Sequence, residues 1–217
     1  MTTLALYRTR VINSLDDSTL KYSNDIIDEA IRKVLNEYTR AFPNIKTASV
    51  TVSAAGRSQS LALCSNLMNI FQLIHPYIST AADPFHPERE DFILTWSDGS
   101  PTVYFKGDDI PQAAEIIFVK YAAKQALKDL DTAAATTVRD DHEDYLIIGA
   151  AGQAAMMRAS GLTEKWGTIP NQQSNLMMWG QTQYRRFLEF LIELRTEQPI
   201  DIFPNSGWKL DQWDKGS

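Results

Sequence analysis

The sequence contains one cysteine, Cys64, so it has no disulfide bond within the chain. A lone thiol without a surrounding motif is more typical of a small buried residue than of a nucleophile. No uncharged apolar run reaches the ~18 residues that suggest a membrane-spanning helix. The first residues, MTTLALYRTRVINSLDD, lack a basic stretch followed by a long apolar region. We therefore expect no membrane span, no signal peptide and synthesis in the cytosol.

Clusters of basic residues are also missing. The chain of 217 residues has 21 Lys and Arg against 27 Asp and Glu, giving a formal net charge of -6. The densest basic pair, Arg185 and Arg186, is followed by Glu189 and Glu193, a pattern typical of a solvated helix face with an i,i+4 pair between Arg185 and Glu189. Tight binding to nucleic acid through phosphate neutralisation is therefore not expected.

Helical patterns occur at both ends of the sequence. Residues 3–14 show a weak helical period, and a stronger helix is predicted from an N-cap at Ser23 to the break before Pro43. A third helix is predicted from a capping box at Thr137 to a stop at Gly161. The last helix is predicted over 175–197, with one apolar side formed by Met178, Tyr184, Phe187, Leu188, Leu191 and Ile192.

Strand patterns fill the middle of the sequence. Residues 45–63 alternate polar with apolar around a turn at Gly56. Residues 92–109 repeat this pattern around Asp98-Gly99, and residues 115–122 are a third run that could complete a small antiparallel sheet. The predicted fold is therefore α+β: a helical bundle from residues 1–44 and 126–199, with an inserted antiparallel β-sheet region at 45–125.

The last residues, 200–217, have no helical period but contain three large aromatic side chains, Phe203, Trp208 and Trp213. Ordering such a tail costs about 1–2 kcal/mol per residue in backbone entropy, whereas three buried aromatics return only about 1.5–3 kcal/mol each. We predict an extended C-terminal arm whose three aromatics dock on a partner protein, because a few anchors dominate an interface. The alternative is that the tail folds back and pairs with the inserted sheet.

The stretch YLIIGAAGQAAMMR, residues 145–158, allows two interpretations. A phosphate-binding loop needs its glycines directly after a strand, with the phosphate at the N-terminus of the following helix. Here a helix predicted to begin at Thr137 places Gly149 and Gly152 inside the helix, at a cost of roughly 0.5–1 kcal/mol each. Together with Ala155, they form a line of small residues that a neighbouring helix can approach closely. Helix packing is therefore the preferred interpretation.

Candidate catalytic groups are sparse. Residues 139–144, RDDHED, contain His142 among four acids, but consecutive helical residues point in different directions and no second histidine follows at i+4. Acids that favour a helix N-terminus explain this run more simply. A zinc site from His75, His86 and His142 lacks a recognisable spacing. Glu88, Glu90 and Asp91 are paired acids that a solvated loop also explains. No catalytic residue, metal site or cofactor is predicted.

Two segments resemble known phage proteins. The stretch LDDSTLKYSNDIIDEAIRKVLNEYTRAFP resembles the start of head-to-tail connector (adaptor) proteins of tailed double-stranded DNA bacteriophages. The matching residues are Leu15, Asp16, Tyr22, Ser23, Asp25, Ile26, Ile27, Ala30, Tyr38 and Pro43. The stretch from Leu127 to Ala159 is similar to a segment of phage structural proteins, through Leu130, Asp131, Ala135, Thr136, Thr137, Gly149, Ala150, Ala151 and Gly152. Together they cover roughly a third of the chain, and neither motif is catalytic.

The resemblance implies a virion protein of the neck, assembled in the host cytoplasm. Its subunits would form a homo-oligomeric ring, a dodecamer, docked under the portal protein and offering a platform to the stopper or tail, while DNA only passes through the channel. The inserted sheet is larger than in the smallest adaptors, so a stopper or tail terminator stays open. Two other classes also stay open: a metal-dependent hydrolase using His142 and neighbouring carboxylates, and a ligand-binding module with a deep apolar pocket.

Overall fold

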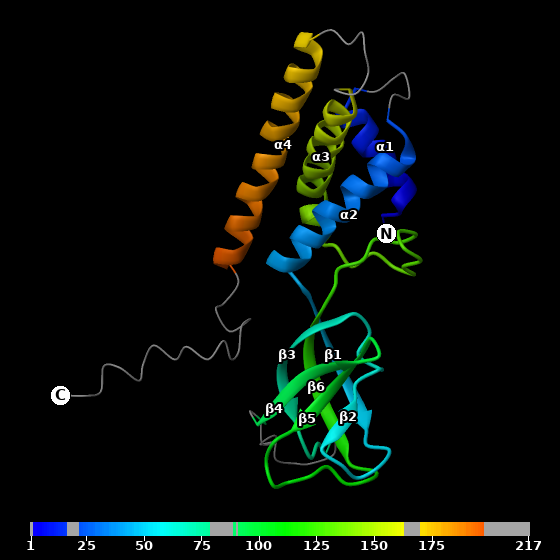
Figure 1. The fold of residues 1–217 in the computed structure, drawn as a ribbon, viewed down its shortest axis with the longest axis vertical. Coiled ribbons are helices and arrows are strands. Elements are labelled where there is room, and N and C mark those ends of the chain that lie inside the picture. Colours follow the sequence, from blue (N-terminus) through cyan, green and yellow to red (C-terminus); the bar gives the residue numbers. More distant parts are fainter. Residues whose placement is uncertain (1, 17–21, 79–88, 90, 163–169, 198–217) are drawn as a thin grey trace, which may run out of the picture. The chain divides into compact units, whose positions relative to one another are not determined.

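The computed structural model describes residues 2–16, 22–78, 89, 91–162 and 170–197. Within them the fold is mixed α+β, with four α-helices and two small antiparallel sheets (Figure 1). Internal contacts divide the chain into two compact units. The helical unit consists of Met1–Asn44 and Lys124–Glu197, and the described part of the sheet unit is the intervening segment Ile45–Ala123.

The first two helices begin at the residues that the sequence indicates. Helix α1 (Leu4–Ser14) is capped by Thr3, and α2 (Asn24–Ala41) is capped by the side chain of Ser23 and ends two residues before Pro43. A bidentate ion pair joins the helices: Nε and Nη2 of Arg8 donate to the two carboxylate oxygens of Asp28 at 2.7 and 2.5 Å. Both helix predictions are confirmed.

The second half of the helical unit contains two long helices that lie side by side (Figure 1). A short 3₁₀ turn, η1 (Asp140–His142), leads into α3 (Glu143–Leu162), and α4 (Pro170–Glu197) follows. Helix α4 begins with a proline, which suits the first helical position because its missing N–H would have no partner there. It is longer than the predicted 175–197.

The predicted helix start at Thr137 is wrong. The backbone N–H of Ala126 donates to Oγ1 of Thr137 at 2.8 Å, and the same hydroxyl donates to the side-chain oxygen of Gln125 at 2.7 Å. Threonine side chains fix loops as readily as they cap helices, and here Thr137 holds a loop that precedes η1. The predicted stop is close to the observed one, since Gly161 lies in the last turn of α3.

The sheet unit contains two three-stranded sheets rather than the single sheet that the sequence predicts. One has the order β1-β6-β3, from β1 (Asn44–Thr51), β6 (Ile116–Ala123) and β3 (Leu67–Ile74). The other has the order β2-β5-β4, from β2 (Ser58–Ser60), β5 (Ser100–Phe105) and β4 (Phe92–Ser97). The runs on either side of Gly56 are both strands, but they belong to different sheets. The sequence prediction also missed β3.

The predicted hairpin at Asp98-Gly99 is confirmed. Strands β4 and β5 pair in antiparallel register from Phe92↔Phe105 to Ser97↔Ser100. Asp98 and Gly99 form the two-residue turn with φ angles of 50° and 77°. Such turns need positive φ at both positions, so an Asp-Gly pair is a strong local hairpin signal.

Each unit has its own core. In the helical unit one buried cluster includes Tyr7 and Val11 of α1, Val34 and Tyr38 of α2 and Phe187 of α4. In the sheet unit both sheets contribute to a single cluster; its members include Val50, Leu73, Val103, Phe105, Ile117, Val119 and Tyr121. Large apolar side chains outside these clusters remain exposed, and they mark candidate surfaces for contact with a partner.

Candidate assembly surfaces

The small residues predicted for helix packing lie in α3, and two of them contact α4. A Cβ built on Gly149 would lie 2.7 Å from Cγ of Phe187, and one built on Gly152 would lie 2.7 Å from the carbonyl oxygen of Gly180. Ala155 is fully buried. Contacts this short leave no room for a side chain, so α3 is narrow where α4 of the same chain presses against it. The phosphate-loop interpretation fails, because both glycines lie within a helix.

The sequence analysis missed Gly180, which is the partner of Gly152. A Cβ built on Gly180 would lie 2.7 Å from the carbonyl oxygen of Gly152, so the contact between the two glycines is reciprocal. A signal was present, since a glycine in the interior of a long helix carries a cost that needs a reason. The small-residue face of α3 is covered by α4 of the same subunit and therefore cannot contact another copy.

His142, the centre of the enzyme hypothesis, is part of the helical core. The residue is 5% exposed. Nδ1 lies 2.8 Å from the hydroxyl oxygen of Tyr38, and the imidazole meets the rings of Phe42 and Phe190 edge-on, with centroids 5.2 Å away in both cases. Its Nε2 lies 3.7 Å from the carboxylate of Asp141. The buried imidazole, surrounded by Tyr38 and two phenylalanine rings, therefore packs η1 against α2 and α4.

Three of the four acids around His142 form ion pairs with arginines. Asp141 pairs with Arg139, and this contact holds the pKa of the Asp141 carboxyl below its usual value. Nη1 of Arg10 in α1 lies 3.0 Å from Oε2 of Glu143, and its Nη2 contacts Asp144. Within the described ranges no three His, Cys, Asp or Glu side chains are grouped so that they could hold a metal ion.

The other candidate ligands are also accounted for or lie outside the described residues. Nε2 of His75 lies 2.9 Å from Oε2 of Glu115 in the sheet unit. The pKa of Glu115 is lowered, first by the backbone N–H of Gln112 and then by His75. Asp91 faces Arg89 at 3.5 Å. His86, Glu88 and Glu90 lie outside the described residues. Cys64 is buried, as expected for a lone core cysteine.

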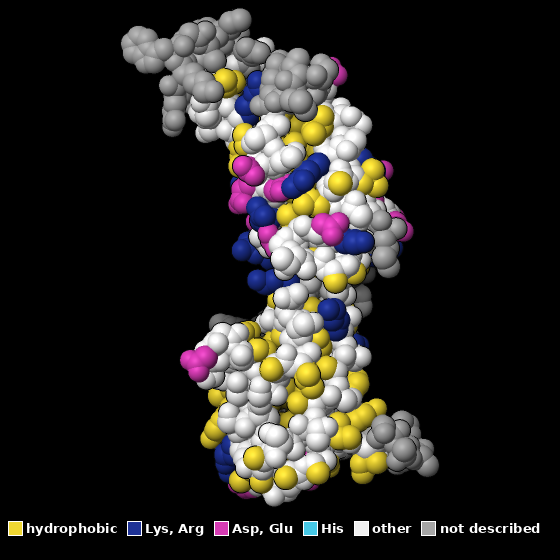
Figure 2. All heavy atoms as spheres, turned by 90° about the vertical axis from the view of Figure 1, so that its right-hand side faces the viewer, with side chains coloured by type: hydrophobic (Ala, Val, Ile, Leu, Met, Phe, Trp, Pro, Cys, Tyr) yellow, Lys and Arg dark blue, Asp and Glu magenta, His cyan; other side chains and the backbone are white. Residues whose placement is uncertain are grey.

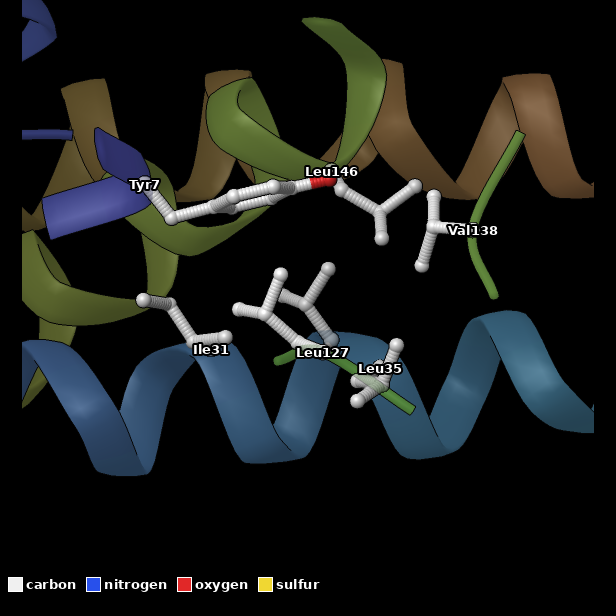
Figure 3. A pocket seen from close by; sticks show the side chains of 7 residues that line it. Tyr7, Ile31, Leu35, Leu127, Val138 and Leu146 are labelled. Carbon is white, nitrogen blue, oxygen red and sulfur yellow. The ribbon is translucent and has the colours of Figure 1, made fainter. Parts of the chain in front are cut away.

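A small cavity in the helical core bears on the ligand-binding hypothesis. It measures about 10 Å³, roughly the minimum for one water molecule. It is enclosed by apolar side chains (Figure 3); its lining residues are Tyr7, Ile31, Val34, Leu35, Leu127, Val138 and Leu146. A cavity of this size is a packing defect and cannot bind an organic ligand.

Helix α4 has an apolar surface beyond the part that packs on α3. Of the side chains predicted to form one apolar side of the helix, Phe187 and Leu191 are buried and Tyr184 is partly buried. Met178, Leu188 and Ile192 instead face outward, with exposed fractions of 62%, 38% and 61%. The apolar side predicted for this helix is therefore divided between the core and an exposed surface.

The sheet unit has exposed apolar side chains of its own. Ile93 of β4 and Tyr104 of β5 are direct cross-strand partners, and both are exposed, as is Trp96 of β4. On the face of the molecule in Figure 2, acidic and basic side chains gather over the helical unit, whereas the sheet unit presents mainly hydrophobic and uncharged atoms. Exposed apolar groups in both units are candidates for contact with other proteins.

The predicted docking residues Phe203, Trp208 and Trp213 lie outside the described residues. No protein-family model and no curated protein matches the chain. In the described part of the chain, no helix is both long enough and apolar enough to cross a membrane.

Proposed function

We propose that this chain is a virion structural protein, the subunit of a head-tail adaptor ring in the neck of a tailed bacteriophage. The ring, a dodecamer, sits under the portal protein, joins the capsid to the stopper or tail, and continues the channel through which the genome is ejected. The four helices form its bundle, and residues 200–217 form the arm that reaches the portal. The family resemblance of the helical segments supports this assignment.

The observation that carries the proposal is the exposed apolar surface of α4. Met178, Leu188 and Ile192 are exposed, and none of them belongs to the buried cluster of the described helical residues. Apolar side chains grouped on one exposed face mark sites of protein association. In the same unit, the histidine that an enzyme would need is enclosed by Tyr38 and two phenylalanine rings. The chain's conspicuous exposed residues are therefore suited to contacts and not to bond chemistry.

Charge supports passage of DNA without binding. The net charge of -6 opposes attraction of phosphates. A channel that DNA must slide through benefits from this, since each phosphate contact would slow movement. We expect the residues that line the channel to be acidic or uncharged. A channel wall dominated by lysine and arginine in the assembled ring would refute this part of the proposal.

The test is made in the phage that encodes the chain. Purified particles should contain this polypeptide in a fixed ratio to the portal protein, and density for it should lie between portal and tail in images of the neck. Disrupting its gene should give DNA-filled heads without tails. Tailed, infectious particles made without the chain would refute the proposal. Density in another neck layer would instead assign it as a stopper or tail terminator.

The enzyme hypothesis makes opposite predictions for the purified protein. A metal-dependent hydrolase using His142 would be a compact monomer with stoichiometric zinc, measurable by elemental analysis and sedimentation. We expect assembly beyond a monomer, and substoichiometric metal that does not change when His142 is replaced by glutamine. Loss of one bound zinc per chain in that variant would favour the enzyme.

A further inference from the structure

The exposed residues of α4 separate into two flanks of different character. At 3.6 residues per turn, residues seven apart lie on one line along a helix. Met178, Arg185 and Ile192 form one such line, and Leu188 and Arg195 form the next. All five side chains are exposed, and we call them the basic flank.

The other exposed side of α4 is the acidic flank. It contains Glu189 on the line through Thr182, and Glu193 on the line through Trp179 and Arg186. All five of these side chains are exposed, including the tryptophan. Arg186 is the one basic member, and its Nη1 donates to the side chain of Gln183. The predicted pair between Arg185 and Glu189 is absent from the ion pairs of the described residues, so both charges are available to a partner.

We propose that α4 of one subunit packs against α4 of the next copy of the chain, with the basic flank of one meeting the acidic flank of the other. The proposal rests on the proposed function for the ring, and it names the surface through which neighbouring subunits touch. Met178, Leu188 and Ile192 lose water at this contact and supply its apolar centre. Arg185 lies between Met178 and Ile192 along the helix, and Arg195 lies on the neighbouring line. These two arginines reach Glu189 and Glu193 of the adjacent copy.

The proposed ring sets the symmetry of the contact. In a twofold dimer each contact occurs twice, residue i against j and j against i, so opposite flanks can also meet in a dimer of parallel helices, and the measured size of the assembly decides between a dimer and a ring. A head-to-tail contact joins two different surfaces and repeats around a closed ring. In a ring the corresponding helices of neighbours run in the same direction, so Arg185 lies about one turn from Glu189 of the adjacent copy, within reach of a long side chain.

Charge reversal on the full chain tests the pairing of flanks. Two double variants each give α4 two flanks of the same sign. They are Arg185→Glu/Arg195→Glu, with two acidic flanks, and Glu189→Arg/Glu193→Arg, with two basic flanks. Each should remain monomeric in native mass spectrometry and sedimentation, whereas the unaltered chain assembles beyond a dimer. The fourfold variant that combines all these changes should assemble again, and so should an equimolar mixture of the two single-flank variants. Arg40→Glu, an exposed change on α2, serves as the control and should assemble normally.

The other outcomes overturn either the pairing of the flanks or the function on which it rests. Assembly of the unaltered chain that neither single-flank variant weakens places the subunit contact elsewhere and leaves the adaptor function intact. Failure of both the fourfold variant and the mixture to recover overturns the pairing of the two flanks. The full chain could also remain monomeric while a truncated form, residues 1–197, self-associates. That result would show that the chain's own tail covers α4. Charge-dependent rings from a chain that is missing from phage necks would refute the proposed function alone.

Discussion

Gly152 of α3 and Gly180 of α4 face each other so closely that each occupies the space of the other's missing side chain. A Cβ on either residue would lie 2.7 Å from the carbonyl oxygen of the other. Both glycines lie inside helices, where each costs about 1 kcal/mol relative to alanine. The cost is offset because close contact between the two helices brings Phe187 against Gly149 and completes the core.

Replacing Gly152 by alanine should therefore destabilise the helical unit, although alanine is the better helix former. The new methyl group would collide with backbone atoms of Gly180 and Tyr184, which cannot move as a side chain can. We expect a loss of about 1–3 kcal/mol in the free energy of unfolding, measured by urea titration with far-UV circular dichroism.

Gly161→Ala is the matched control in the same helix. Nothing lies within 4 Å of a Cβ at Gly161, so the change should stabilise the unit by up to about 1 kcal/mol. Equal effects of the two substitutions would contradict the close-contact explanation for Gly152.

The hydrogen bond between Tyr38 and His142 gives a second prediction. Tyr38→Phe keeps the ring stacked on Phe42 but removes the hydroxyl that lies 2.8 Å from Nδ1 of His142. We expect a loss of about 1–2 kcal/mol in the free energy of unfolding. Tyr145→Phe, which removes an exposed hydroxyl from a ring stacked on Phe190, should change it by less than about 0.5 kcal/mol. A Tyr38→Phe protein as stable as the parent would show that the hydrogen bond is not needed.

Local signals in the sequence identified the elements that local chemistry controls. Ser23 caps α2 because its side chain accepts a hydrogen bond from the backbone N–H three residues later. Asp98-Gly99 fixes the β4–β5 hairpin because its turn needs positive φ at adjacent positions. The partners of strands are different, since pairing joins distant segments. The β3 run LMNIFQLI has no clean alternation, because its buried residues are spaced three or one apart and its pairing with β6 shifts register twice, and so no period marked it as a strand.

The sequence predicted the candidate surfaces only in part, because local patterns identify single residues but not their partners in other helices. Gly149 and Gly152 were identified because glycines in a helical pattern are unusual, but Gly180 lies in a different helix and its pairing depends on the tertiary fold. Thr137 was misplaced because a threonine before acids signals a cap, while its true hydrogen-bond partners, Gln125 and Ala126, lie more than ten residues earlier in the chain. The hydrophobic period of the α4 sequence does not indicate which of its apolar side chains are covered by α3.

Burial of Cys64 predicts a pH dependence in the sheet unit. Desolvation raises the pKa of its thiol to about 11, from 9.0 for an accessible thiol. Below pH 9 the thiol is neutral in both folded and unfolded chains, so it adds no dependence. Between pH 9 and 11 only the unfolded chain loses the proton, which favours unfolding by up to about 3 kcal/mol in total.

Denaturant titrations of the parent and of Cys64→Ala should reveal this effect. The free energy of unfolding should fall more steeply with rising pH in the parent, and the difference in slope should be confined to the interval between the two pKa values. A thiol reagent should label the folded parent far more slowly than the unfolded chain. Rapid labelling of the folded protein near neutral pH would contradict the burial of Cys64.

Removing residues 200–217 separates folding from attachment. Each unit has a large buried cluster formed by residues before the tail, so the truncated chain should keep the circular dichroism spectrum and the unfolding midpoint of the parent. It should no longer bind the portal ring, because many tails dock together and each loses its aromatic anchors. Trp208→Ala and Trp213→Ala in the full chain should each weaken binding of one arm by about 30-fold, measured with single chains at an immobilised portal. Lys209→Ala, between the two tryptophans, should have little effect. Global unfolding of the truncated chain would show instead that the tail belongs to its own fold.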